Sequence, residues 1–221
     1  MKKTALITGA SRGIGKAIAN VFKKNGIECI IPTHKNMDLL NPDSINNYIS
    51  SLKQDIDIIV NNAGINIIAE HDVLDNKLFD DMLQVNLKAP LQIIKGLSKQ
   101  MKVNKYGRIV NISSIWSQIS KEGRLAYSST KAGINGMTRT LALELAQYNV
   151  LVNAVAPGYV NTDLTKQNNS SEQIEQIKSN IPLQRMAEPE EIAELVYFLC
   201  SEKNTYITGQ VIIADGGFIC K

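Results

Sequence analysis

Tyr127 and Lys131 are two side chains capable of acid–base chemistry, four positions apart in the segment YSSTK. The surrounding residues predict a helix, where this spacing places both side chains on one face. A tyrosine phenol has an ordinary pKa of about 10 and is a poor acid–base group near neutral pH. A neighbouring ammonium stabilises the phenolate and lowers that pKa. The pair therefore predicts proton exchange with an alcohol or carbonyl oxygen.

Two serines, Ser113 and Ser114, directly follow the apolar run 107–112, which predicts a β-strand. In an open α/β sheet, the carboxyl ends of the strands face the ligand. A hydroxyl at that edge can hydrogen-bond a substrate oxygen as negative charge develops on it. Position alone allows either serine to take this role.

Three glycines, Gly9, Gly13 and Gly15, punctuate the segment TGASRGIG between an expected first strand and an expected first helix. Glycine allows a tight turn and a close approach of the backbone to a pyrophosphate. The N-terminus of the following helix presents free N–H groups and its dipole to negative charge. A glycine-rich turn without ligand is the alternative anywhere else in a chain, but this context favours a dinucleotide site.

The second expected strand ends in the segment IPTHK, residues 31–35, which contains no carboxylate. Sites for NAD usually place an acidic residue there to hold the ribose 2′-hydroxyl. Arg12, His34 and Lys35 instead offer groups suited to a 2′-phosphate. We therefore expect NADP(H), with NAD(H) as the alternative and a plain surface role for Lys35 left open.

Motifs along the whole chain resemble those of the short-chain dehydrogenase/reductase family, and most closely its 3-oxoacyl-[acyl-carrier-protein] reductase branch. They are, in order, TGxxxGIG from Thr8, NNAG from Asn61, YxxxK from Tyr127, PGxVxT from Pro157 and DGG from Asp215. The resemblance implies a Rossmann-fold enzyme that moves hydride between a nicotinamide cofactor and a carbonyl or alcohol.

The resemblance also assigns roles to single residues. It implies a catalytic set of Asn86, Ser114, Tyr127 and Lys131, with Ser114 preferred to Ser113 by its separation from the tyrosine. Asn86 would stabilise a helix kink and hold a water that relays protons to the lysine. The cofactor-binding residues expected from the motifs and the charge argument are Gly9, Ser11, Arg12, Gly13, Ile14, Gly15, His34, Lys35, Asp38, Leu39, Asn62, Ala63, Gly64, Tyr127, Lys131, Pro157, Gly158, Val160 and Thr162.

One stretch departs from the family pattern. The segment from the second strand to Asp38 is shorter than in typical members, as though a helix were cut down. Asp38 and Leu39 resemble the family's adenine-contacting pair, but a cap or loop role for Asp38 is the alternative.

The elements that position these residues alternate between short apolar runs and amphipathic stretches, which is typical of a parallel sheet covered on both faces. With 221 residues, we expect one doubly wound three-layer α/β/α domain over residues 1–221. The expected strands are Ala5–Thr8, Glu28–Ile31, Ile56–Asn61, Gly107–Ile112, Leu151–Ala156 and Gln210–Ile213. The expected helices are Gly15–Asn25, Pro42–Leu52 capped by Asn41, Leu78–Val103 as one or two helices, Ala126–Gln147, and Glu188–Cys200 with Pro189 in its first turn.

The polar segment 163–185 interrupts this alternation. Insertions of this kind are often active-site lids, and a disordered surface loop is the alternative. We expect a substrate lid here. Arg185 at its end could meet an acidic carrier protein or a substrate phosphate.

Composition excludes several other classes of protein. A net charge of +3 without a Lys/Arg run does not suit nucleic acid. Cys29, Cys200 and Cys220 are far apart and predict neither a disulfide framework nor a metal site. The apolar run after Lys3 is too short for a signal peptide or membrane span, so we expect a cytoplasmic protein. By resemblance it would be a homo-oligomer, a tetramer or dimer packed through the helices of Asn86 and Tyr127.

The predicted function is therefore carbonyl or alcohol oxidoreduction with NADP(H), on a small-molecule or carrier-bound substrate such as a 3-oxoacyl thioester. A dedicated sugar or small-ketone reductase of the same family is the alternative. A non-catalytic NADP(H)-binding regulator is a third reading, although such a protein would be expected to lose Ser114, Tyr127 or Lys131.

Overall fold

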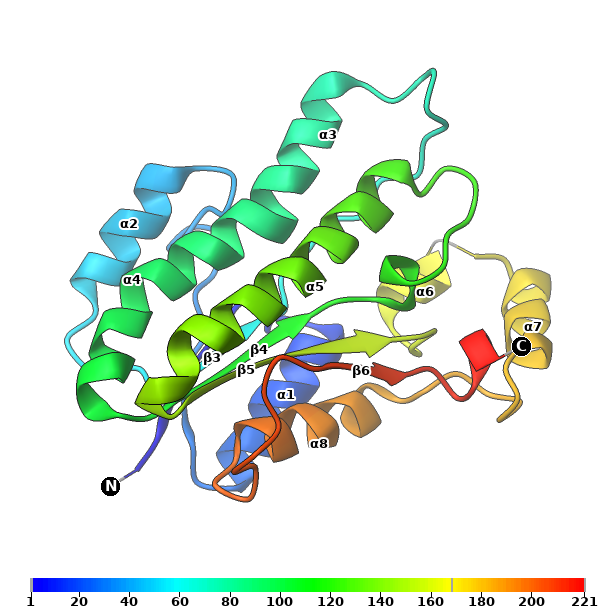
Figure 1. Ribbon diagram of the computed structural model, residues 1–221. Coiled ribbons are helices and arrows are strands. Elements are labelled where there is room, and N and C mark those ends of the chain that lie inside the picture. Colours follow the sequence, from blue (N-terminus) through cyan, green and yellow to red (C-terminus); the bar gives the residue numbers. More distant parts are fainter. Residues whose placement is uncertain (1, 168, 221) are drawn as a thin grey trace.

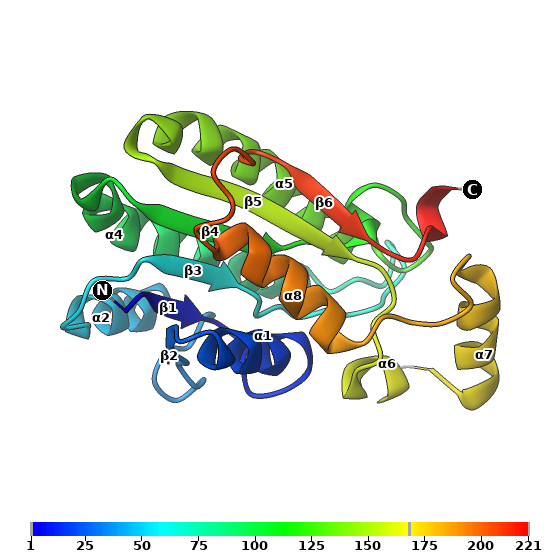
Figure 2. The same ribbon diagram turned by 90° about the horizontal axis from the view of Figure 1, so that it is seen from below.

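A six-stranded parallel sheet forms the centre of the protein. The computed structural model describes residues 2–167 and 169–220. The strands lie in the order β2-β1-β3-β4-β5-β6, and every neighbouring pair is parallel (Figure 2). They are β1 (Thr4–Ile7), β2 (Glu28–Ile30), β3 (Ile58–Asn61), β4 (Gly107–Ile112), β5 (Val150–Pro157) and β6 (Val211–Ala214). All six predicted strands are confirmed, with ends that differ by one or two residues.

Burial follows the place of each strand in the sheet. Every residue of β1, β3, β4 and β5 is buried, whereas the edge strands β2 and β6 are partly exposed. Strands covered on both faces are rich in apolar residues without regular alternation, and the polar residues Arg108, Asn111 and Asn153 within β4 and β5 are buried with them. The sequence therefore predicted the inner strands from composition alone.

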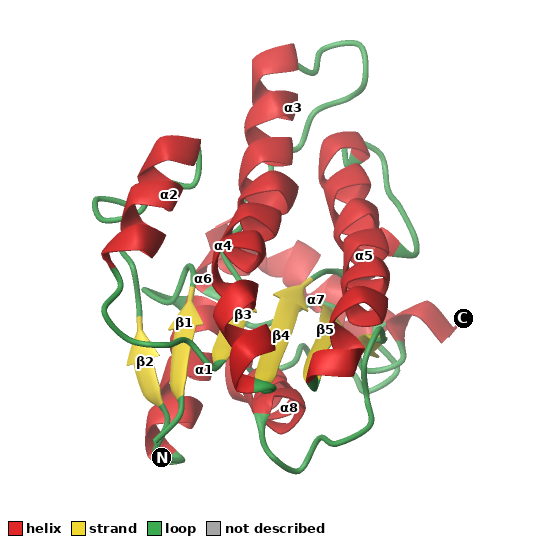
Figure 3. Cartoon of the chain, turned by 60° about the vertical axis from the view of Figure 1, so that its left-hand side comes forward, coloured by secondary structure: helices red, strands yellow, loops and turns green. Residues whose placement is uncertain are grey.

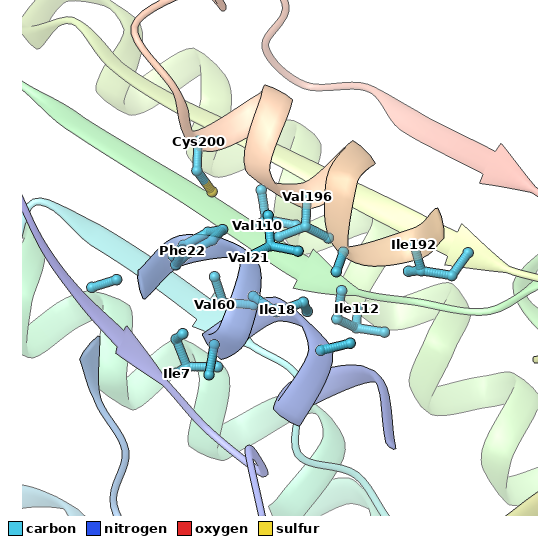
Figure 4. Packing of buried hydrophobic residues seen from close by; sticks show 14 of the residues in the cluster. Ile7, Ile18, Val21, Phe22, Val60, Val110, Ile112, Ile192, Val196 and Cys200 are labelled. Atoms are coloured by element: carbon cyan, nitrogen blue, oxygen red, sulfur yellow. The ribbon is translucent and has the colours of Figure 1, made fainter. Parts of the chain in front are cut away.

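Helices α1 (Gly13–Lys24) and α8 (Pro189–Cys200) pack against each other over one face of the sheet (Figure 2). Figure 4 shows the core between them, where Ile18 and Phe22 of α1 meet Ile192 and Val196 of α8 above the strands. Ile18, Phe22 and Val196 are fully buried. This packing fixes α1, and with it the glycine-rich loop that precedes it.

Helices α2 (Pro42–Ser51), α4 (Ala89–Asn104) and α5 (Leu125–Leu145) cover the opposite face (Figure 3). Asn41 caps α2 by accepting hydrogen bonds from Asp43 and Ser44, as predicted. The two covered faces confirm the doubly wound three-layer fold.

The segment 76–104 is one nearly continuous helical run with an irregular turn inside it. Helix α3 (Asn76–Leu83) passes into a π-helical turn, η1 (Gln84–Lys88), and then into α4. Such turns bulge the helix and are frequent at functional sites. Asn86 lies within this π-helical turn. The family resemblance predicts that this residue stabilises a kink in the helix.

The segment that follows β5 carries two short helices, α6 (Asp163–Gln167) and α7 (Ser171–Asn180), and Figure 1 shows α7 beside the C-terminal end of the chain. Ser170 and Gln173 form a reciprocal capping box at the start of α7. Asn168, at the centre of the predicted lid, lies outside the described residues. Short 3-10 turns complete the structure at η2 (Ile115–Ser117), η3 (Ala146–Tyr148) and η4 (Phe218–Cys220). Over the described residues, the structure contains no helix with the length and apolarity that a membrane span requires.

Candidate active site

A cavity of about 440 Å³ opens at the carboxyl ends of the central strands. Such an edge is where open α/β sheets bind ligands. Of the residues predicted from the sequence, the cavity is lined by Gly9, Ser11, Arg12, Gly13, Ile14, Gly15, Asn62, Ala63, Gly64, Ser114, Tyr127, Lys131, Pro157, Gly158, Val160 and Thr162. Five predicted residues lie outside the described lining: His34, Lys35, Asp38, Leu39 and Asn86.

The glycine-rich loop leaves room that side chains would fill. Gly9 has φ of +67°, and a Cβ there would lie 2.8 Å from the Cα of Ala63. A Cβ on Gly15 would collide with the carbonyl oxygen of Gly9. Among the described residues, no side chain caps the N-terminus of α1, so its first N–H groups are available to an anion. The loop therefore fits the pyrophosphate of a nicotinamide dinucleotide.

Thr8 organises the wall of this cavity and was missed as a site residue by the sequence analysis. Its hydroxyl oxygen accepts hydrogen bonds from the backbone N–H groups of Asn62 (3.1 Å) and Ala63 (3.0 Å). The Asn62 side chain in turn donates to the carbonyl oxygens of Thr8 and Gly9. These bonds tie the ends of β1 and β3 together. The signal available in the sequence was a hydroxyl at the last position before the first glycine.

The predicted catalytic residues come together at the junction of β4 and α5. Ser114 and Tyr127 line the same cavity, and the Ser114 hydroxyl acts on the Tyr127 phenol by lowering its pKa. The ammonium of Lys131 is buried, lies 5.5 Å from the centre of the Tyr127 ring and donates to the carbonyl oxygen of Ile112 at 2.7 Å. Ser113 points elsewhere, since its hydroxyl donates to the carbonyl oxygen of Lys131. The geometry therefore favours Ser114 over Ser113 as the partner of the phenol.

Burial dominates the electrostatics of the tyrosine–lysine pair. It lowers the pKa of Lys131 to about 8, because the charged ammonium loses hydration. It raises the pKa of Tyr127, against the opposing effects of the Ser114 hydrogen bond and the positive charge of Arg124. The sequence analysis expected Lys131 to lower the pKa of Tyr127. The structure assigns that lowering to Ser114 and Arg124 instead, and it is smaller than the effect of burial.

Asn86 lies outside the described lining of the cavity and makes three side-chain hydrogen bonds. Its side chain accepts from the backbone N–H of Ile65 and donates to the Ile65 carbonyl oxygen, both at 2.9 Å, and donates to the Thr130 hydroxyl at 3.1 Å. A Cβ on Gly64 would approach Asn86 Oδ1 to 3.2 Å and Lys131 Nζ to 3.7 Å. The glycine therefore keeps a narrow space between the two side chains.

The predicted adenine-side residues form a turn of their own. Asp38 accepts a hydrogen bond from the backbone N–H of Leu40, and its carboxylate lies 3.5 Å from His34 Nδ1. Leu39 packs into the core beneath α2 and α4. Asp38 therefore stabilises a local turn, and its contact with the adenine stays a prediction. His34 and Lys35 are exposed on the same edge of the sheet as the glycine loop, since β2 pairs with β1.

Other cavity residues were not predicted. Arg124, Trp116, Tyr159 and Asn66 line the part of the cavity near Tyr127. Arg185, for which an anion-binding role was considered, instead forms a two-pronged ion pair with Glu191, with contacts of 2.6 and 2.7 Å. Arg124 also lines the cavity and forms no ion pair among the described residues, and it was not predicted because it is a single residue outside any motif.

A parallel sheet with a glycine-rich phosphate loop at its carboxyl edge defines a dinucleotide-binding α/β protein. Residues 3–42 match the family described as short chain dehydrogenase, and residues 33–219 match the family described as Enoyl-(Acyl carrier protein) reductase. The chain belongs to the short-chain dehydrogenase/reductase family of oxidoreductases, as the sequence motifs predicted.

Curated relatives support this membership over the full length. The 3-oxoacyl-[acyl-carrier-protein] reductase FabG of Aquifex aeolicus is 41% identical over 244 residues, covering 97% of this chain and 96% of the relative. The uncharacterized oxidoreductase YmfI of Bacillus subtilis is 36% identical over 243 residues, covering all of both chains.

Among solved structures of similar proteins, some contain NADH and others contain NADP. 4-Hydroxyisoleucine dehydrogenase complexed with NADH has a TM-score of 0.94 at 29% identity, and ElxO with NADP bound has a TM-score of 0.91 at 29% identity. Each comparison covers 100% of both chains. These likenesses support a nicotinamide cofactor for the fold.

Proposed function

We propose that this protein is an NADP(H)-dependent oxidoreductase that interconverts a carbonyl group and an alcohol. The observation that carries the proposal is the placement of Ser114, Tyr127 and Lys131 in one cavity with the glycine-rich loop of α1. A regulator without catalysis would have no need of this acid–base set.

When bound, the nicotinamide supplies hydride to the carbonyl carbon or accepts it from the alcohol. In the reducing direction, Ser114 donates a hydrogen bond to the carbonyl oxygen, and the Tyr127 phenol transfers its proton to that oxygen. Lys131 holds a positive charge beside the phenol as it loses the proton. Asn86 Oδ1, which accepts one hydrogen bond from Ile65 and can accept a second, would hold the water that returns a proton to Lys131.

The preference for NADP(H) rests on charge. No carboxylate follows β2 within residues 31–35, whereas Lys35 is exposed there and Arg12 lines the cavity at the start of α1. Cationic side chains form stronger, charge-assisted hydrogen bonds with the 2′-phosphate of NADP(H) than with the 2′-hydroxyl of NAD(H). The His34–Asp38 contact leaves His34 less suited to this role than Lys35 and Arg12.

The first candidate substrate is a 3-oxoacyl thioester, by analogy with the FabG relatives. The second is a sugar or small ketone. It is favoured by the polar and aromatic residues beside Tyr127, namely Asn66, Trp116 and Tyr159.

Two further features belong to the proposal. Segment 163–185 is a substrate lid, supported by the position of Asp163, Thr165 and Asn169 on the cavity wall. The protein also assembles as a dimer or tetramer through α4 and α5, where Leu91 and Leu143 are 46% and 82% exposed.

A paired assay tests the function. Fluorescence titration with NADPH and NADH measures which cofactor binds, and NADPH oxidation is then followed with an acetoacetyl thioester and with neutral small ketones. We expect tighter binding of NADPH, and we expect Lys35→Asp to reverse that preference while Lys53→Asp, an exposed lysine after α2, does not. Tighter binding of NADH by the wild type would overturn the cofactor choice. Failure to oxidise NADPH with any carbonyl would overturn the activity.

A further inference from the structure

Arg124 lines the catalytic cavity and forms no ion pair with any described residue. It is the N-cap residue of α5, three positions before Tyr127, and therefore lies on the same side of the helix start as the phenol. Its charge acts on both Tyr127 and Tyr159. The guanidinium is thus close to the place where the substrate oxygen must lie.

The protein leaves this guanidinium unsatisfied. Its Nε and Nη1 atoms are shielded from solvent and have no hydrogen-bond partner among the described residues. Within residues 2–167 and 169–220, none of the ion pairs involves Arg124. Buried charges are ordinarily paired, and buried donors are ordinarily bonded. A ligand is the natural source of the missing partner.

Aromatic side chains hold the guanidinium in place. Its carbon lies 5.6 Å from the centre of the Trp116 ring. Trp116 packs edge-to-face on Tyr159, and Tyr159 packs on Phe218 from the C-terminal segment. An arginine stacked on such a row has lost much of its freedom before any ligand arrives, which favours binding.

The charge of the cavity agrees with an anionic ligand. Its described lining contains three cationic residues, Arg12, Arg124 and Lys131, and one carboxylate, Asp163. Arg12 lies at the N-terminus of α1, where the cofactor phosphates would bind, and Lys131 is paired with the Ile112 carbonyl oxygen. Arg124 therefore remains as the positive group on the substrate side.

We infer that the substrate carries a carboxylate a few bonds from the reacting carbonyl or alcohol carbon, and that Arg124 binds this carboxylate. The inference rests on the proposed oxidoreductase function and assigns it short oxo acids or hydroxy acids as substrates, in place of the 3-oxoacyl thioester considered by analogy. A planar guanidinium matches a carboxylate in shape, and its nearness to Tyr127 limits how far the two substrate groups can be apart. A thioester whose charged groups lie far from its carbonyl leaves Arg124 unpaired.

Kinetics with matched substrates tests the inference. Wild-type protein and the Arg124→Gln variant are assayed with 3-oxobutanoate and with its neutral methyl ester. The substitution should raise KM for the acid by about 10- to 100-fold, the range for a charge-assisted bond, and change KM for the ester by less than about twofold. Arg124→Lys should recover part of the acid's affinity. Arg139→Gln, which removes an exposed arginine from the same helix, is the control and should leave both substrates unchanged.

A binding measurement gives a readout that needs no turnover. Trp116 is the single tryptophan of the chain and lies against Arg124, so its fluorescence reports on this position. With NADP+ bound, butanoate should change the fluorescence and butanamide should not, and the response should vanish in Arg124→Gln. Equal responses to both probes, or a response to inorganic phosphate alone, would overturn the carboxylate assignment.

The two proposals fail in different ways. If Arg124→Gln affects acid and ester alike, the inference is wrong while the oxidoreductase function stands. If neither compound nor any other carbonyl is reduced, the proposed function is wrong, and the Trp116 titration still decides whether Arg124 binds a carboxylate.

Discussion

The side-chain amide of Asn86 pairs with the backbone of Ile65 through two hydrogen bonds, each 2.9 Å long. Asn86 lies in the π-helical turn between α3 and α4, and Ile65 lies in the loop that follows β3. The amide therefore fixes a loop on the cavity wall to the helical layer, and its bond to Thr130 extends the connection to α5. The Asn86 side chain therefore connects the loop after β3, the π-helical turn and α5, the helix that carries Lys131.

Removing this amide should destabilise the fold. In Asn86→Ala, the N–H and carbonyl of Ile65 lose their partners, and unpaired buried groups cost roughly 1–3 kcal/mol each. We expect the free energy of unfolding in urea to fall by about 2–4 kcal/mol. Asn104→Ala, at the exposed end of α4, is the control and should change it by less than about 0.5 kcal/mol. An equal effect of both substitutions would contradict the role of the amide.

Gly9 and Gly26 both have positive φ, but only at Gly9 would a Cβ collide with other atoms. Comparing alanine substitutions at the two positions therefore distinguishes the effect of a steric clash from that of backbone strain. Gly9 has φ of +67° and backbone atoms of Ala63 where a Cβ would lie, whereas Gly26 has φ of +79° and nothing within 4 Å. Gly9→Ala should therefore weaken NADPH binding at least about tenfold, since a loss of 1.4 kcal/mol is a factor of ten. Gly26→Ala should lower stability through backbone strain and leave the affinity for NADPH unchanged. Equal affinities in the two variants would show that the close approach at Gly9 does not serve the cofactor.

The adjacent serines should behave differently when each hydroxyl is removed. Ser114 lines the cavity with Tyr127 and lowers the pKa of its phenol, whereas Ser113 donates to the Lys131 carbonyl oxygen. Because Ser114 would stabilise charge on the substrate oxygen, Ser114→Ala should lower kcat by about 10²–10³-fold. Ser113→Ala should keep kcat within about tenfold of the wild type, since it perturbs a structural hydrogen bond. A larger loss of kcat in Ser113→Ala than in Ser114→Ala would show that Ser113, and not Ser114, stabilises the substrate oxygen.

The buried ammonium of Lys131 makes stability depend on pH. Its pKa is about 8 in the folded protein and about 10.4 in an unfolded chain. Between these values the unfolded state binds more protons, so this lysine makes the folded state relatively more stable as the pH rises from 8 towards 10. Below pH 8 the full desolvation penalty is present.

This dependence can be isolated by comparison with Lys131→Met, which cannot titrate at this position. The free energy of unfolding of the wild type minus that of the variant should increase between pH 7.5 and pH 9.5, measured by urea unfolding. A difference that is constant or that falls with pH would show that the folded protein does not disfavour the ammonium.

The sequence predicted the fold because the buried strands are rich in apolar residues, and because some helix boundaries, such as the Asn41 cap of α2 and the glycines before α1, are local signals. The family resemblance grouped Ser114 with Tyr127 and Lys131, and the structure places these three residues on one cavity. What the sequence could not predict depends on contacts between distant segments. The hydrogen bonds of Thr8 to the loop after β3, the pairing of Arg185 with Glu191, and the enclosure of Arg124 by Trp116 all require the folded chain.

Asp38 is a residue whose motif match alone does not identify its role. Its position in the sequence matched a family motif, yet its carboxylate closes a local turn by accepting from the Leu40 N–H. Short acidic side chains readily bond their own backbone two residues on, and a motif match does not distinguish this use from ligand binding.

Hydride transfer assisted by Tyr127 is the central claim, and transfer of an isotope label tests it most directly. NADPH dideuterated at C4 of the nicotinamide is incubated with a carbonyl substrate and either wild-type protein or Tyr127→Phe, and the product is analysed by mass spectrometry. We predict one deuterium on the new carbinol carbon with the wild type, formed at least about 10²-fold faster than with the variant. An alcohol without deuterium, or equal rates for the two proteins, would contradict the account.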